Sequence, residues 1–162
     1  MFTIRPAAAS DATAILQVHR DAILAKSAAH YSHDVLSGWA IGPTPERTAR
    51  QERQIADPGV ISLVAESAGE VIGFAIADPS AQELRSLYVK PNRIGRVGSA
   101  LLEELERRAF AACDRLTCDA SLNAVSFYTA HGYVEMEPIA HQLSSGLRVP
   151  CVRMAKYRQH PT

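Results

Sequence analysis

The chain has 162 residues, enough for one well-buried core, and 47% of them are hydrophobic, which is typical of a globular protein. Basic and acidic residues balance at 17 each, so the charge gives no reason to expect a nucleic-acid or membrane partner. No apolar run approaches the ~18 residues of a membrane span, and the amino terminus lacks a signal-peptide pattern. We expect a cytoplasmic protein in which residues 1–162 form a single domain and the 3 cysteines are reduced and buried.

The first half of the chain alternates between strand and helix patterns. Residues 2–6 are predicted to form a strand, and Ser10 is the predicted N-cap of the helix that follows. The apolar stripe of that helix consists of Ile15, Val18, Ala22 and Ala25. A second helix is predicted to begin at Pro45, since proline is tolerated at the first helical position. Residues 60–66 and 71–78 are predicted to form a hairpin of two apolar strands.

The second half continues this alternation. Residues 83–89 read as a fourth strand, which runs through a loop into a helix. The predicted buried face of that helix consists of Leu101, Leu105, Ala109 and Ala112. Further strands are predicted at 116–119, 133–139 and 150–157, with a short helix at 123–131 that either Ser121 or Asn123 can cap. The pattern predicts an α/β (α+β) fold.

The loop between strand 83–89 and its helix is the most informative segment. A strand, a basic glycine-bearing loop and a helix N-terminus form an anion site, because the first-turn N–H groups are free and the helix dipole favours negative charge. Arg93 and Arg96 add charge and hydrogen-bond donors. The spacing Gly95-x-x-Gly98, with no Gly-Lys pair, excludes a P-loop and a dinucleotide fingerprint. The segment predicts a pyrophosphate ligand; the alternative is a surface turn that caps a helix.

Two motifs resemble signatures of the GNAT N-acetyltransferase superfamily. The loop is similar to the acetyl-CoA loop Q/R-x-x-G-x-G/A, with Arg93 first and Gly98 last, although Arg96 stands where that pattern has its first glycine. Residues 120–133 resemble the second signature, N-x-x-A-x-x-F/L-Y-x-x-x-G-F/Y. The resemblance covers residues 2–157. It implies a mixed, mostly antiparallel seven-stranded sheet flanked by about four helices, and transfer of an acetyl group from acetyl-CoA to a primary amine in a ternary complex.

The resemblance also implies where acetyl-CoA binds. Backbone N–H groups around Leu87 and Val89 would hold it, where a bulge splays the strand from its neighbour. Arg96 can donate its N–H group only if it avoids a positive φ. Asn123 would bond the pantetheine or phosphate end, with helix capping as its alternative role. The candidate cofactor-binding residues are Leu87, Tyr88, Val89, Arg93, Ile94, Gly95, Arg96, Val97, Gly98, Ser99, Asn123 and Tyr128.

Amine acylation needs a free amine, yet a lysine-like ammonium has an unperturbed pKa of ~10.4, so a base must remove a proton. Strand alternation predicts that Glu83 shares a face with Arg85, Leu87 and Val89, and the resemblance implies that the coenzyme lies beside this strand. Glu83 is therefore the candidate general base, directly or through water; the alternative is a carboxylate that is solvated or paired with Arg85. By resemblance, Tyr128 donates a proton to the coenzyme sulfur or orients it, which suits a phenol that is protonated at neutral pH.

The acceptor side is less patterned. Tyr31 and Trp39 are candidate substrate contacts, with a packed helix–helix turn as the alternative, and His141 is a third candidate, with an exposed or structural role as the alternative. His30 and His33 form an H-x-x-H pair, but no further ligands follow at a suitable spacing, so we expect no metal. The resemblance implies that the partners are acetyl-CoA and an amine, with a homodimer as a possible assembly.

Two functions from other classes remain open at this point. The first is a non-catalytic acyl-CoA-binding or regulatory domain on the same fold, which the presence of Glu83 and Tyr128 disfavours. The second is a nucleotide-binding module, in which residues 123–133 would have no role. The sequence does not identify the amine acceptor, because the fold alone does not determine a substrate.

Overall fold

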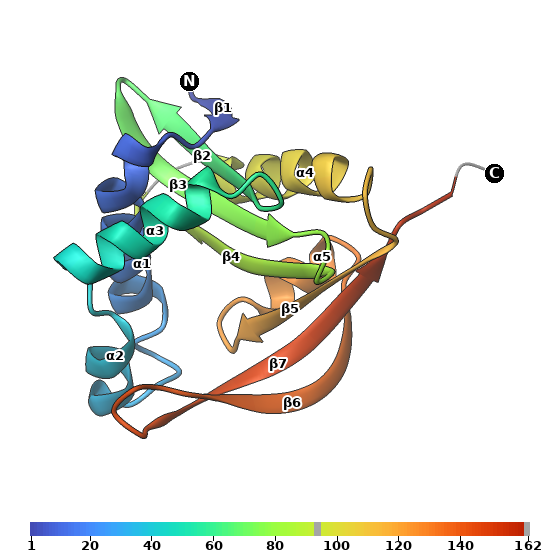
Figure 1. Ribbon diagram of the computed structural model, residues 1–162. Coiled ribbons are helices and arrows are strands. Elements are labelled where there is room, and N and C mark those ends of the chain that lie inside the picture. The colour runs from blue at the N-terminus through green and yellow to red at the C-terminus, as the bar shows by residue number, and fades with distance from the viewer. Residues whose placement is uncertain (93–94, 161–162) are drawn as a thin grey trace.

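A seven-stranded sheet with strand order β1-β2-β3-β4-β5-β7-β6 forms the centre of the computed structural model, which describes residues 1–92 and 95–160 (Figure 1). The strands are β1 (Thr3–Pro6), β2 (Ile61–Ser67), β3 (Glu70–Asp78), β4 (Glu83–Val89), β5 (Arg115–Ser121), β6 (Val134–Gln142) and β7 (Arg148–Tyr157). Every neighbouring pair is antiparallel except β4 and β5, which are parallel. The predicted mixed, mostly antiparallel seven-stranded sheet is confirmed.

Five α-helices flank this sheet in the described part of the chain. They are α1 (Ala12–Lys26), α2 (His33–Trp39), α3 (Pro45–Ala56), α4 (Val97–Ala109) and α5 (Val125–Ala130), with a short 3-10 helix at Ala9–Asp11 before α1. The sequence patterns did not predict α2, whose 7 residues are too few to show a helical period. Its N-cap is Ser32, whose hydroxyl accepts the Val35 N–H group at 3.3 Å.

Helices α4 and α5 cover one face of the sheet. The α4 residues Leu101, Leu102 and Leu105 are fully buried against small side chains of β3, such as Ala75 and Ala77. Gly73 permits this close approach, since a Cβ atom there would lie 3.0 Å from the Leu101 side chain and 3.1 Å from a backbone carbonyl. The packing fixes the first turn of α4 beside the end of β4.

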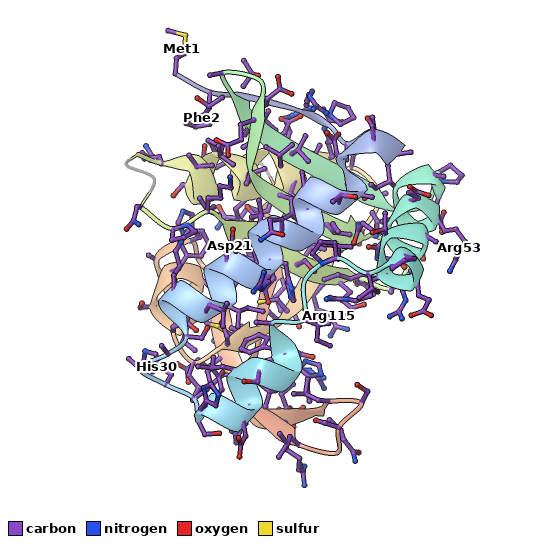
Figure 2. The ribbon with its side chains drawn as sticks, turned by 90° about the vertical axis from the view of Figure 1, so that its left-hand side faces the viewer. Met1, Phe2, Asp21, His30, Arg53 and Arg115 are labelled. Carbon is purple, nitrogen blue, oxygen red and sulfur yellow. The ribbon has the colours of Figure 1, made fainter. Side chains whose placement is uncertain are left out.

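Helices α1 and α2 cover the opposite face. Figure 2 shows α1 crossing the sheet, with α3 beside it and Arg53 on the outer side of α3. Ile15 and Val18 of α1 are buried against Phe74 and Ile76 of β3. Further along, Ile23 packs with residues of α2 and β7 in a separate buried cluster. Helix α1 therefore spans both halves of the sheet, and Ser27, which follows its last residue, contacts Asn123 just beyond the end of β5.

Details of the predicted helix ends and buried faces are wrong. Ser10 does not cap a helix: it lies within the 3-10 turn. Asp11 instead accepts the backbone N–H group three residues before it, at 2.7 Å, and pairs with Arg5 at 2.7 Å. Ala25 and Ala112 are exposed rather than buried. In α1 the apolar stripe shifts as it follows the 3.6-residue turn, so Ile23 rather than Ala25 faces the core at its end. Ala112 lies in the turn beyond α4, which ends at Ala109.

The cysteines Cys113, Cys118 and Cys151 are free and buried, as predicted. Burial raises the pKa of the Cys118 thiol to about 12 and that of Cys151 to about 11, so neither is a reactive thiolate at neutral pH. Within residues 1–92 and 95–160, no helix combines the length and the apolar character that a membrane crossing requires.

Candidate active site

The site begins with a gap in the sheet between β4 and β5. These parallel strands pair only where Glu83 lies opposite Thr117, and they separate beyond that point. The Lys90 N–H group donates to a β3 carbonyl at 2.8 Å, and N–H directions alternate along a strand. The N–H groups of Leu87 and Val89 therefore point away from β3 and into the gap. These N–H groups therefore have no hydrogen-bond partner on β5. Such a separation of the strand from its neighbour was expected from the sequence.

A cavity of about 380 Å³ fills this gap. Its walls come from α1, β4, the loop before α4, and the segment from the end of β5 through α5. They consist of Ala22, Lys26, Ser27, Leu87, Tyr88, Val89, Gly95, Arg96, Gly98, Ser99, Ser121, Asn123, Ala124, Phe127 and Tyr128. The cavity thus joins nine of the predicted cofactor-binding residues. Of the remaining three, Val97 is buried in the core, and Arg93 and Ile94 lie outside the described residues.

The N-terminus of α4 opens into this cavity. Gly95 has a φ of +117°, while Arg96 has a φ of −91°, so the glycine rather than the arginine adopts the left-handed conformation. The Arg96 side chain does not cap the helix; it is exposed and lies 3.2 Å from Glu103. The N–H groups of the first turn are therefore available to an anion. A Cβ atom on Gly98 would meet Phe127 at an ordinary 3.5 Å, so the fold itself tolerates a side chain there.

Tyr128, on the short helix α5, also lines the cavity. Its ring packs edge-on against Phe127 and Tyr133, with both centroid distances at 5.3 Å. Burial raises the pKa of the Tyr128 phenol well above its ordinary value, so the hydroxyl is protonated at neutral pH. Among the described residues, none hydrogen-bonds this hydroxyl. Gly132, with a φ of +87°, ends the helix as the sequence predicted.

Asn123 does not cap α5, whose N-cap is Ala124. Its side-chain oxygen accepts a hydrogen bond from Ser27 at 3.0 Å, and Ser27 is 2% exposed. Counting back from Ala124 and Tyr128 in the second signature, the asparagine position falls on Ser121 rather than Asn123. Ser121 is the last residue of β5 and faces the cavity. The spacing of the motif was the signal that could have identified Ser121 from the sequence.

A second cavity, of about 310 Å³, adjoins the first on the α1 side of the sheet. It brings together the predicted base Glu83 and the predicted substrate contacts Trp39 and His141. Its other walls are His19, Leu84, Arg85, Ser86, Tyr88, Asp119, Ser121, Leu143, Val149 and Cys151. Tyr88 and Ser121 line both cavities, so the two spaces meet between the ends of β4 and β5.

Glu83 reaches this second cavity for a reason that strand alternation did not predict. A bulge in β4 places Leu84 opposite Ala77 and Ser86 opposite Ile76, so Arg85 is an extra residue. Because the bulge reverses the alternation, Glu83 shares a face with Ser86 and Tyr88, not with Leu87 and Val89. The predicted common face of Glu83, Arg85, Leu87 and Val89 is wrong.

The Glu83 carboxylate is only weakly engaged by its neighbour. Arg85 lies 3.5 Å from Glu83 but 2.6 Å from Asp78, which is its principal partner. The Glu83 side chain is 46% exposed, so it keeps access to water. This geometry disfavours the alternative in which Glu83 serves mainly as the ion-pair partner of Arg85.

Polar residues that the sequence analysis did not select complete the second cavity. Asp119 lies 2.9 Å from Arg153 and 3.0 Å from the Nε2 atom of His141. His19 lies edge-on to the Tyr88 ring at 4.7 Å, and burial lowers the pKa of His19 to about 4, which leaves it neutral at pH 7. Burial raises the pKa of the Tyr88 phenol. No local sequence pattern could have identified Asp119 and His19, because β4, β5 and α1 come together only in the folded chain.

Tyr31 is part of the framework rather than of a cavity wall. Its hydroxyl donates to the Pro150 carbonyl at 2.6 Å and accepts the Leu122 N–H group at 2.9 Å. The residue is 9% exposed, and burial raises the pKa of its phenol. Tyr31 packs edge-on against Trp39 at 5.4 Å, and of this pair only Trp39 lines the second cavity. These contacts favour the alternative role of Tyr31 in a packed helix–helix turn, because its hydroxyl ties the residue after Ser121 to strand β7.

Residues 29–157 match the family model described as an acetyltransferase (GNAT) domain. Because this match covers most of the chain, the protein belongs to the GNAT acetyltransferase family, and the resemblance noted in the sequence is confirmed. The class of the protein is thus that of acetyl-CoA-dependent acetyltransferases. Among curated protein sequences, none matches the chain significantly.

Solved structures support the same fold. A GCN5-related N-acetyltransferase structure from Rhodopseudomonas palustris, also described as "Aminotransferase, Class-II", is 29% identical, with a TM-score of 0.82 over 96% of this chain and 95% of that one. The PaiA N-acetyltransferase of Thermoplasma acidophilum, solved with coenzyme A, is 21% identical, with a TM-score of 0.73 over 98% and 99% of the chains. YncA of Salmonella typhimurium, a putative acetyltransferase solved with acetyl-CoA, is 23% identical, with a TM-score of 0.69 over 100% and 97%.

The described residues contain no group of three or more His, Cys, Asp or Glu side chains that could hold a metal ion. His30 and His33, the H-x-x-H pair, both lie on the surface around the start of α2.

Proposed function

We propose that this protein is an N-acetyltransferase that transfers the acetyl group of acetyl-CoA to a primary amine, by direct attack in a ternary complex. One observation carries the proposal: two cavities of different character meet at Tyr88 and Ser121. The first offers backbone donors and a helix N-terminus to an anionic, elongated ligand. The second offers Glu83 to an amine, next to the same meeting point.

The first cavity suits the coenzyme. The unpaired N–H groups of Leu87 and Val89 would bond the pantetheine as an added strand does. The first-turn N–H groups of α4 and the side chain of Ser99 would bond the pyrophosphate. We also assign Arg93 and Ile94 to this site on the loop signature. When bound, acetyl-CoA supplies an activated thioester whose carbonyl carbon accepts the amine.

Glu83 is the proposed general base. Its carboxylate lines the acceptor cavity, remains accessible to water and has only a weak ionic contact with Arg85. It can therefore accept a proton from the ammonium form of the acceptor, directly or through water. Asp119 lines the same cavity but is committed to Arg153 and His141, which makes it the weaker candidate for the base.

Tyr128 is the proposed general acid. Burial favours the neutral phenol, so its proton is available to the departing thiolate. Its hydroxyl has no hydrogen-bond partner within residues 1–92 and 95–160, which leaves it available to the coenzyme. Tyr88, a second buried phenol at the meeting point, would contact the acceptor side of the reaction. Asn123, held by Ser27, would present its amide N–H groups to the pantetheine.

Calorimetric titration with acetyl-CoA and with ATP, followed by thiol-release assays on a library of primary amines, tests the proposal. We expect binding of acetyl-CoA but not of ATP, and release of one thiol for each amine acetylated. Acetyl-CoA binding without turnover on any amine would favour a non-catalytic acyl-CoA-binding domain. Preferential binding of ATP would refute the assignment of the first cavity.

A further inference from the structure

His131, which follows the last residue of α5, connects that helix to the first turn of α4. Its Nδ1 atom lies 2.8 Å from the backbone oxygen of Phe127, and its Nε2 atom lies 3.0 Å from the hydroxyl oxygen of Ser99. The imidazole also packs on the Phe127 ring, with centroids 4.4 Å apart. Phe127 and Ser99 both line the first cavity. His131 therefore links the α4 wall of that cavity to its α5 wall.

The hydrogen-bond partners determine which ring nitrogen carries the proton. A backbone carbonyl only accepts, so Nδ1 of His131 must be the donor to Phe127. In the neutral imidazole Nε2 is then an acceptor, and it takes the single hydroxyl hydrogen of Ser99. The Ser99 oxygen then offers only lone pairs to the cavity. A phosphate oxygen placed there would be repelled rather than bound.

Protonation of His131 reverses this arrangement. Both ring nitrogens then donate, so the Ser99 oxygen accepts from Nε2 and its own hydrogen becomes free to point into the cavity. We propose that protonated His131 is a positioning residue that turns the Ser99 hydroxyl into a donor to the pyrophosphate of acetyl-CoA. Cofactor binding is then coupled to proton uptake at His131. This inference rests on the proposed function of the first cavity.

The charged groups around His131 indicate that the imidazole is the group that takes up the proton. A shallow surface hollow brings together His131 and the titratable or charged residues Glu103, Glu106, Arg107, Lys156, Tyr157 and Arg158. Each of the two carboxylates in that hollow is ion-paired: Glu106 lies 2.6 Å from Lys156, and Glu103 lies 3.2 Å from Arg96. Among these groups, only a histidine is of a type that ordinarily changes charge between pH 5 and 8.

Dephospho-CoA is the appropriate probe, because it keeps the pyrophosphate but lacks the 3′-phosphate, and phosphate monoesters themselves titrate near pH ~6. Calorimetric titration in buffers of different ionisation enthalpy gives both the affinity and the number of protons exchanged. We expect a dissociation constant about tenfold lower at pH 5.5 than at pH 8.0, the difference between a neutral and a charge-assisted contact. Binding at intermediate pH should take up a fraction of one proton.

Two variants separate positioning from a purely structural role. His131→Asn keeps a side-chain N–H donor for the Phe127 carbonyl but removes Nε2 and the charge, so the pH dependence of binding should disappear. Ser99→Ala keeps the imidazole of His131 but removes the hydroxyl, so most of the pH dependence should disappear there too. His30→Asn, which replaces an exposed histidine outside both cavities, is the matched control and should behave like the wild type.

Equal affinity at the two pH values in the wild type would overturn the inference. So would a pH dependence that persists in Ser99→Ala, and this variant decides the matter if His131→Asn does not fold. Absence of any binding of acetyl-CoA or dephospho-CoA across this pH range would overturn the proposed function itself, and the inference with it. Binding of both ligands with no effect of pH would overturn only the inference.

Discussion

Replacement of Tyr31 by phenylalanine separates a framework residue from a substrate contact. The change removes one hydroxyl and keeps the ring that packs against Trp39. That hydroxyl makes two hydrogen bonds, at 2.6 Å to the Pro150 carbonyl and at 2.9 Å from the Leu122 N–H group. Both partners are backbone groups, so they cannot rotate away to find other protein partners.

The magnitude follows from these two contacts. A typical hydrogen bond contributes ~1 kcal/mol net, and a partner left unsatisfied costs more where water cannot reach it. Leu122 is 37% exposed, so water partly replaces the phenol. We therefore expect the free energy of unfolding to fall by about 2 kcal/mol in Tyr31→Phe. For a domain of this size that corresponds to a melting temperature lower by about 4–8 °C.

Thermal unfolding and steady-state kinetics of Tyr31→Phe should be measured together. We expect the loss of stability with an unchanged Michaelis constant for the amine. Tyr157→Phe, at a tyrosine that is 63% exposed, is the matched control and should leave both quantities unchanged. A Tyr31→Phe protein with wild-type melting temperature and a raised Michaelis constant for the amine would refute the framework role and support the predicted substrate contact.

The remaining predictions concern chemistry, the coenzyme cavity and acid stability. Tyr128→Phe should lower turnover ~10²-fold or more, with acetyl-CoA affinity unchanged, since a general acid is lost. Glu83→Gln should lower turnover and change the acidic limb of its pH profile. Gly98→Val should raise the dissociation constant of acetyl-CoA about tenfold or more without unfolding the protein, because its Cβ meets Phe127 at 3.5 Å while its methyl groups enter the cavity. Asp11→Asn should cost about 2 kcal/mol of unfolding free energy at pH 7. Hydrogen bonds from Arg5 lower the pKa of Asp11, so this contribution is present above the unfolded value of ~3.9 and disappears as the pH falls through the folded pKa.

Each of these predictions has an outcome that contradicts it. Full turnover in Tyr128→Phe, or an unchanged pH profile in Glu83→Gln, would remove that residue from the chemistry. Wild-type coenzyme affinity in Gly98→Val would move the coenzyme away from the α4 N-terminus. A stability difference for Asp11→Asn that is as large at pH 2 as at pH 7 would show that the ion pair with Arg5 is not its source.

The sequence predicted those parts of the fold that depend on local pattern. Strand periodicity located β1 through β7 to within a few residues, because alternation and turn residues are encoded within each segment. Gly132 was identified as the helix-ending residue, because a left-handed C′ position favours glycine. The loop before α4 was predicted to be an anion site on the same local grounds. These features need no knowledge of which strands pair.

Features that arise from pairing between distant segments were not predictable in this way. The bulge at Arg85 exists only in the register between β3 and β4, so alternation alone put Glu83 on the wrong face. The Tyr31 hydroxyl finds its partners 91 and 119 residues along the chain, which no local pattern encodes. Ser121 is a different case, since its position in the second signature could have been read from the spacing to Tyr128.

An initial-rate measurement of thiol release, with acetyl-CoA and an amine varied together, tests the central claim most directly. If both substrates occupy their adjoining cavities at once, double-reciprocal plots intersect, and mass spectrometry finds one acetyl group on the amine for each thiol released. Parallel lines together with an acetylated enzyme would show a covalent ping-pong route and contradict direct transfer. Absence of amine-dependent thiol release would contradict the assignment of the two cavities to an acetyl donor and its acceptor.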